Sequence, residues 1–187
     1  MIKIHIQAHE RWDERTETFY GSEEAYDFKL EHSLASISKW EAKYHKPFLS
    51  SDKSNGEMID YFRMMVVGEE PESLEPFLFL TKAQIDEIGK YINDSQTATT
   101  FSKEEDEEAA KKAPSDKFTT SEELYYYMTA QNIPFECQFW HLNRLITLIK
   151  VCAIKNKPED KKKKKLTSSD LAARRLRMEA ARKKYGG

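Results

Sequence analysis

Apolar and polar residues alternate in two short segments near the start of the chain. Every second residue is apolar over residues 2–6 and again over residues 26–30, which predicts two half-buried β-strands. Residues 16–20 are a weaker candidate for a third strand, and we expect the rest of segment 9–24 to be a polar loop. These strands predict a strand pair or a small antiparallel sheet.

The spacing of apolar residues then becomes helical. Residues 34–44, 58–66 and 85–92 each carry apolar side chains three and four positions apart, which predicts amphipathic helices. Ser33 is placed to cap the first helix and Ser54 or Asn55 to cap the second, while Thr81 and Gln84 form a capping box for the third. The strands and helices together predict an α+β domain over residues 1–101.

The second half of the chain is predicted to be helical. Residues 102–117 combine dense charge with no apolar periodicity, so we expect a linker or a solvated loop there. A helix capped by Thr120 should end at Asn132–Pro134. Residues 135–155 are apolar on nearly every face and predict one long helix, which is either a central core helix or partly buried by another subunit. Residues 118–156 would thus form a helical hairpin.

Charge is distributed unevenly along the sequence. The net charge is −2, but residues 155–187 hold 13 Lys and Arg against four Asp and Glu, which leaves +9 there and −11 on residues 1–154. We expect residues 157–187 to form a basic tail with a helix over 170–184. Such a tail suits docking on an acidic partner or on another copy, nucleic-acid binding, or simple solubilisation. The expected docking residues are Lys161, Lys163, Arg174, Arg175, Arg177 and Arg182.

Motifs for catalysis, cofactors and metals are weak or missing in the sequence. There is no glycine-rich phosphate loop and no Cys or His spacing typical of a metal site. Cys137 and Cys152 fall in the apolar segment, where burial raises a thiol pKa, and they lie too far apart on one helix to form a disulfide. We therefore expect no enzyme activity and a reducing, cytoplasmic setting. No apolar run reaches the roughly 20 residues of a membrane helix.

Three phrases in the chain resemble one protein family. They are L-E-H-S-L…S-K-W-E…K-P-F-L within residues 28–49, T-A-T-x-F at residues 97–101, and I-P-F-E-C-Q…W-H-L-N-R-L within residues 133–145. They are similar to the tail assembly chaperones of long-tailed bacteriophages. The resemblance implies a non-enzymatic protein of the host cytoplasm that binds the tape measure protein, helps tail tube subunits to assemble, and self-associates.

The apolar segment supplies the expected partner-binding surface of such a chaperone. Two alternatives remain open: a structural tail or connector protein of the virion, and a nucleic-acid-binding module that uses the basic tail. Only Tyr185 accompanies the basic residues of that tail, which disfavours stacking on single strands and makes nucleic acid the less favoured partner. The expected partner-binding residues are Phe135, Phe139, Trp140, His141, Arg144 and Leu148.

Overall fold

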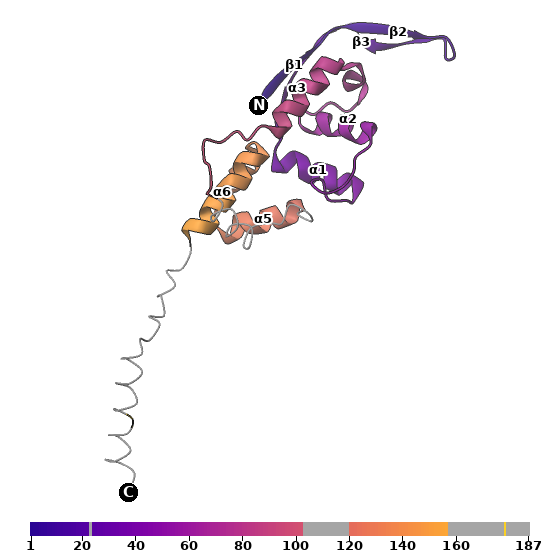
Figure 1. Ribbon diagram of the computed structural model, residues 1–187. Coiled ribbons are helices and arrows are strands. Elements are labelled where there is room, and N and C mark those ends of the chain that lie inside the picture. Colours follow the sequence, from indigo (N-terminus) through magenta and orange to yellow (C-terminus); the bar gives the residue numbers. More distant parts are fainter. Residues whose placement is uncertain (23, 103–119, 157–177, 179–187) are drawn as a thin grey trace. The chain divides into compact units, whose positions relative to one another are not determined.

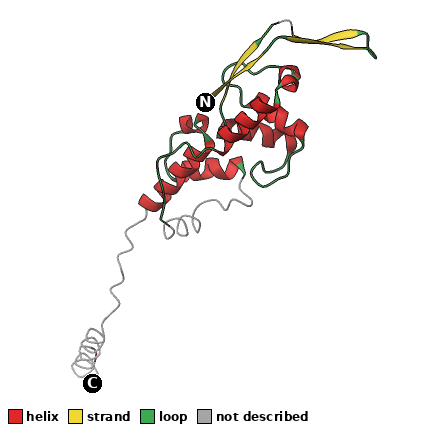
Figure 2. Cartoon of the chain, turned by 45° about the horizontal axis from the view of Figure 1, so that its top comes forward, coloured by secondary structure: helices red, strands yellow, loops and turns green. Residues whose placement is uncertain are grey.

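The computed structural model describes residues 1–22, 24–102, 120–156 and 178. Residues 1–155 form one compact unit (Figure 1). Strand pairs near the N-terminus are followed by helices (Figure 2), which confirms the predicted α+β class. The predicted basic tail with its terminal helix, except for Met178, and the linker over 102–117, except for Ser102, lie outside the described residues.

Two antiparallel strand pairs open the fold. Strand β1 (Ile2–Ile6) pairs with β4 (Tyr26–Leu30), with Ile2 opposite Leu30. Strand β2 (His9–Asp13) pairs with β3 (Thr18–Ser22). The strands at 2–6 and 26–30 are confirmed, whereas β2 lies in the segment predicted to be a loop. Glu10, Arg11 and Trp12 of β2 are all exposed, so this strand lacks the alternation that marks a half-buried strand.

The helices begin where local capping signals predict. Ser33, Ser54 and Thr81 each accept a hydrogen bond from the backbone three residues later, and each forms a full capping box. Thr120 accepts a bond from the Glu123 backbone N–H. The α-helices are α1 (Leu34–Tyr44), α2 (Asn55–Met64), α3 (Lys82–Asn93), α5 (Ser121–Ala130) and α6 (Leu142–Lys155), and the 3₁₀ helices are η1 (Glu75–Phe79) and η2 (Phe135–Phe139).

Helix α2 ends at Met64, two residues earlier than predicted. The Glu31 N–H donates to the Met65 carbonyl and the Val67 N–H donates to the Lys29 carbonyl, both at 2.8 Å. Val66 forms a β-bridge with Leu30. The residues after α2 therefore form a short antiparallel bridge with the end of β4, because this pairing satisfies backbone groups that a longer helix would use internally.

The prediction of one continuous helix over residues 135–155 is wrong. Helix η2 ends at Phe139, Trp140 is extended, and α6 starts at Leu142. The break is made by a tertiary contact: Ser33 and His141 form a β-bridge, and the Leu142 N–H donates to the His32 carbonyl at 2.7 Å. Local hydrophobicity cannot reveal this, because the partner lies 110 residues earlier in the chain.

Residues on both sides of segment 103–119 share one hydrophobic core. The carboxylate of Glu41 in α1 accepts 2.7 Å hydrogen bonds from the backbone N–H groups of Phe48 and Ser121, and so holds the start of α5 against α1. The segments predicted as residues 1–101 and 118–156 thus pack into a single unit. Fully buried side chains from both include Leu30, Leu34, Trp40, Tyr61, Leu124, Met128, Leu142 and Leu145.

Candidate partner-binding site

Helix η2 presents two large aromatic side chains to solvent. Phe135 is 54% exposed and Phe139 is 62% exposed, whereas Cys137 between them is buried. Cys137 therefore anchors the 3₁₀ helix to the core while the two phenylalanines project from it. Both belong to the predicted partner-binding residues. Large exposed aromatic side chains are enriched on surfaces that bind another molecule.

A cation and an aromatic ring extend this surface toward α6. The guanidinium carbon of Arg144 lies 4.2 Å from the centre of the Trp140 ring, within the range of a cation–π interaction. Arg144 is exposed and Trp140 is half-buried. Leu148, one turn further along α6, is also half-buried and packs against the core. These three predicted residues therefore offer only part of their surface to a partner.

His141, in contrast, is a core residue. Its side chain is buried, and its Nε2 lies 3.0 Å from the Tyr91 carbonyl oxygen. Its ring stands edge-on to those of Tyr91 and His32, with centroids 4.9 and 5.2 Å apart. The sequence interpretation that placed His141 on the binding surface is corrected here, because these contacts face the interior of the fold.

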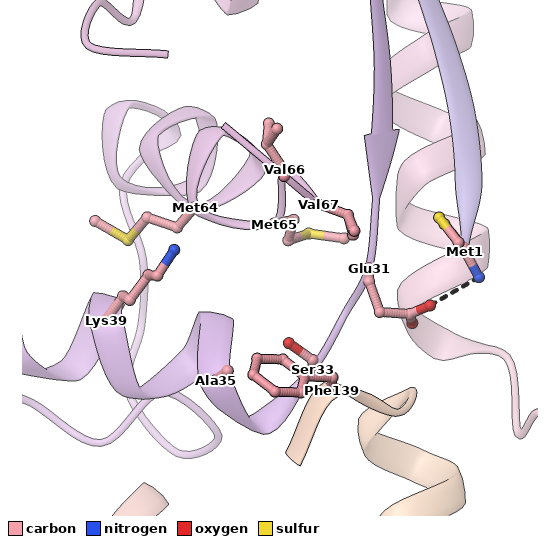
Figure 3. Close-up of a pocket in the computed structure, with 11 residues that line it drawn as sticks. Met1, Glu31, Ser33, Ala35, Lys39, Met64, Met65, Val66, Val67 and Phe139 are labelled. Atoms are coloured by element: carbon pink, nitrogen blue, oxygen red, sulfur yellow. Dashed lines mark ion pairs between the residues drawn. The ribbon is translucent and has the colours of Figure 1, made fainter. Parts of the chain in front are cut away.

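Phe139 also lines a pocket of about 290 Å³ between α1, the end of α2 and the start of the chain (Figure 3). Its apolar wall includes Phe139 and Ala35 and the successive residues Met64, Met65, Val66 and Val67. Pairing of residues 65–67 with β4 holds this wall in place. Methionine side chains adapt their shape to different apolar groups, so the pocket is suited to a variable aliphatic or aromatic side chain.

The charged groups around this pocket are paired. The N-terminal amine lies 2.9 Å from Glu31 Oε2 (Figure 3), and the Tyr91 hydroxyl donates to Glu31 Oε1 at 2.5 Å. Lys39 Nζ lies 2.7 Å from Glu70 Oε2. Because each charge already has an opposite charge beside it, an apolar ligand would leave no lone charge buried. The pocket chemistry therefore favours an apolar side chain over an ion.

The geometry gives little support to nucleophilic catalysis or to metal binding. Cys137 and Cys152 are free thiols, and burial raises the pKa of both, which lowers the fraction of reactive thiolate. Within the described ranges, no three His, Cys, Asp or Glu side chains gather as a metal site would require. No helix in the same ranges is both long and apolar enough to cross a membrane.

Sequence reasoning found the aromatic part of the site but missed its pocket. Met65 and Val66 were expected only as part of the apolar stripe of a helix, and Met64 and Val67 were not singled out. Their role depends on pairing with β4, which leaves no local signal in the sequence. The predicted tail-docking residues all lie outside the described residues. Comparison of the chain with known protein families, with curated proteins and with solved structures finds no match in any of the three.

Proposed function

We propose that this protein is a non-enzymatic assembly chaperone of a long-tailed bacteriophage that binds apolar helical segments of the tape measure protein and aids tail tube assembly. The observation that carries the proposal is the exposed Phe139 ring beside the Met and Val pocket. The resemblance of the sequence phrases supplies the biological setting, in the host cytoplasm during assembly.

The pocket and the η2 aromatics fit a helical client. An amphipathic helix presents side chains on one face at positions i, i+3, i+4 and i+7, and these insert into apolar grooves of a partner. One such side chain can enter the pocket while a neighbouring side chain of the client lies on the exposed Phe139 ring. A pocket lined by flexible methionines tolerates many sequences, as a chaperone for a client with long apolar helices requires.

The direct test is co-expression of the full chain with the tape measure protein, followed by pull-down. We expect the chaperone to keep the client in the soluble fraction and to co-purify with it. Burial of one phenylalanine contributes about 1.5–3 kcal/mol, so Phe139→Ser should weaken binding by roughly 10- to 100-fold. Leu78→Ser is the matched control, because Leu78 is 64% exposed on η1 and does not line the pocket.

Some results of these experiments would contradict the proposal or support one of the alternatives. A client that stays insoluble and unbound beside the full-length protein would overturn the proposal. An equal loss of client binding in Phe139→Ser and Leu78→Ser would show that the pocket is not the binding site. Many copies of the protein in purified particles, measured by mass spectrometry, would instead support a structural virion component. Salt-dependent binding to nucleic acid that is lost on deletion of residues 157–187 would support a nucleic-acid module.

A further inference from the structure

We infer that the buried side chains of His32 and His141 form an acid-sensitive latch. While both imidazoles are neutral, the latch holds η2 and α6 against the junction between β4 and α1, and it opens when the imidazoles take up protons. Because Phe139 belongs to η2, opening of the latch withdraws this ring from its pocket. The effect on the client rests on the proposed function, whereas the latch itself rests on the contacts around the two histidines.

The two histidines lie on either side of a contact between distant segments. His32 directly precedes the cap of α1, and His141 directly precedes α6. Both side chains are buried, and their rings stand edge-on with centroids 5.2 Å apart. The backbone contact beside them consists of the Ser33–His141 bridge and the 2.7 Å hydrogen bond from the Leu142 N–H to the His32 carbonyl. A change in either ring therefore acts where the two segments join.

His141 caps α6 in its neutral form. Its Nε2 lies 3.0 Å from the carbonyl oxygen of Tyr91, which can only accept a hydrogen bond, so Nε2 carries the ring proton. The backbone N–H of Asn143 donates to Nδ1, with 3.3 Å between the two nitrogens. Asn143 is the second residue of α6, and a side chain that accepts from this position satisfies an otherwise unpaired donor of the helix. The unprotonated Nδ1 is thus the acceptor that caps α6.

A proton on Nδ1 of His141 removes this cap. The nitrogen then faces the Asn143 N–H with a hydrogen of its own, and the new positive charge lies at the N-terminal end of α6, where the helix dipole is also positive. A proton on His32 places a charge beside that ring in the core. Burial, and to a smaller extent His141, lowers the pKa of His32 to about 3, so the closed fold resists this proton. Uptake of protons is therefore coupled to opening of the contact.

Two tyrosines contact the rings directly. Tyr61 of α2 has its Oη 2.6 Å from Nδ1 of His32, and the Tyr91 ring of α3 stands edge-on to His141. Burial raises the pKa of both hydroxyls, so they carry no negative charge that would attract a proton to the imidazoles. The buried thiol of Cys137 in η2 also has a raised pKa, chiefly through burial. These groups are therefore neutral at neutral and mildly acidic pH.

The charged groups of the surrounding elements are engaged elsewhere or exposed. Glu31 after β4 pairs with the N-terminal amine, and Glu41 of α1 accepts from two backbone N–H groups. Asp94 after α3 accepts from the backbone N–H two residues later. The guanidinium of Arg144 on α6 lies over an aromatic ring, and Glu136 of η2 is exposed. Within the described ranges, no carboxylate hydrogen-bonds to either imidazole, so none stabilises a protonated ring in this way.

The latch lies next to the proposed client site. Phe139 is two residues before His141, and Ser33, which bridges to His141, lines the same pocket as Phe139 (Figure 3). The wall at residues 64–67 is held by α2 and β4 instead. When the latch opens, the pocket loses Phe139 and keeps its Met and Val wall. An acid-opened chain should therefore bind an apolar client more weakly.

The test is amide hydrogen exchange of the full chain at pH 7.5 and pH 5.5, expressed as protection factors so that the intrinsic pH dependence of exchange is removed. Each imidazole that takes up a proton on opening favours the open form about tenfold over this interval. We expect amides of η2 and of the first turn of α6 to be less protected than those of β1 and β4 at both pH values. At pH 5.5 they should lose a further factor of roughly 10 to 100.

Three variants and a control separate the two histidines. His141→Asn keeps an oxygen that can cap α6 but does not titrate in this range, and His32→Gln removes the other imidazole. Each should reduce the acid-dependent loss of protection about tenfold, and the double variant should abolish it. His5→Gln is the matched control, because the His5 side chain is 56% exposed, and it should behave as the wild type. Circular dichroism melts at pH 7.5 establish that each variant is folded.

Three exchange results would overturn the latch. They are wild-type protection in η2 and α6 that does not fall at pH 5.5, amides there that are as protected as those of β1 and β4 and so open only with the whole fold, and a double variant that keeps the wild-type response.

Pull-down of the tape measure protein at both pH values tests the link to the client. Bound client should fall at pH 5.5 with the wild type but not with the double variant, and equal binding by the wild type at both pH values would overturn this link. A client that binds at neither pH, beside the expected exchange pattern, would count against the proposed function and leave the latch supported.

Discussion

The imidazole of His32 lies against the hydroxyl of Tyr61 inside the core, with Nδ1 and Oη 2.6 Å apart. Both side chains are buried. The pKa of His32 is lowered from 6.5 to about 3, mainly by burial and to a smaller extent by the nearby His141. The ring is therefore neutral in the folded protein at all but strongly acidic pH, and the fold must exclude a proton that the unfolded chain accepts.

This predicts a loss of stability in mild acid. Because the pKa of His32 is lower in the folded chain than in the unfolded one, the unfolded chain binds more protons between pH 6.5 and about 3. The free energy of unfolding should fall there by up to about 1.4 kcal/mol per pH unit from this group. Urea unfolding at pH 6.5 and pH 5 measures the loss. In His32→Gln the fall over that interval should be smaller by about 1.6 kcal/mol, and an equal fall in both proteins would contradict the assignment.

Asp60 is a buried carboxylate held by three donors. Lys43 Nζ and the Tyr44 hydroxyl lie 2.6 and 2.8 Å from Oδ2, and Arg63 Nε lies 3.0 Å from Oδ1. Burial tends to raise the pKa of Asp60, but these hydrogen bonds outweigh it and hold the pKa below its ordinary value. Asp60→Ala should cost about 1–3 kcal/mol, since it removes a buried acceptor that three side chains share.

An exposed contact between a histidine and an aspartate provides the control for Asp60. His5 Nδ1 and Asp27 Oδ1 are 2.9 Å apart, but their side chains are 56% and 84% exposed. Asp27→Ala should therefore change the free energy of unfolding by less than about 1 kcal/mol. Chemical denaturation of both variants at pH 7 gives the comparison, and similar losses from both would show that burial does not decide the effect.

Gly21 cannot be replaced without distorting the hairpin. Its φ is +123°, and a Cβ atom there would lie 2.2 Å from the His9 carbonyl oxygen. Gly21→Ala should open the β2–β3 pair, which amide hydrogen exchange would report as faster exchange in these strands alone. Gly89→Ala is the matched change in α3, where space is open, and it should stabilise the protein by about 0.5–1 kcal/mol. Unchanged amide hydrogen exchange in Gly21→Ala would contradict the close approach between a Cβ atom at this position and the His9 carbonyl oxygen.

Glu41 joins two parts of the chain that are far apart in sequence. Its carboxylate accepts from the backbone of Phe48 and of Ser121. Glu41→Ala leaves two buried donors unpaired, at a cost of about 1–3 kcal/mol each. Hydrogen exchange should rise first in α5, because its N-terminus loses this contact. Exchange that rises equally along α1 and α3 would instead indicate general loosening.

Local signals in the sequence explain which parts of the fold were predictable. Ser54 with Glu57 and Thr81 with Gln84 lie three residues apart, so the capping geometry is set by neighbours within one turn. The alternating strands β1 and β4 were found for the same reason, because one face of each is more buried than the other. Phe135 and Phe139 were predicted as surface candidates because they belong to an apolar run, whose side chains are expected to contact other apolar groups.

Contacts between distant segments explain the rest. The break at Trp140 depends on the hydrogen bond from Leu142 to His32, and the pocket wall at Val66 depends on the bridge to Leu30. Neither partner can be identified from local periodicity. His141 was assigned to the surface because its polarity suggested a rim, whereas hydrogen bonding to the Tyr91 carbonyl satisfies it within the core.

The bond between Leu142 and His32 also sets an order of events during synthesis. The apolar side chains around His32 cannot be fully covered until residue 142 has left the ribosome, 110 residues later. At about 5–20 residues per second, this interval lasts roughly 5–20 s. The nascent chain thus exposes part of its own apolar surface for that time, before its fold closes.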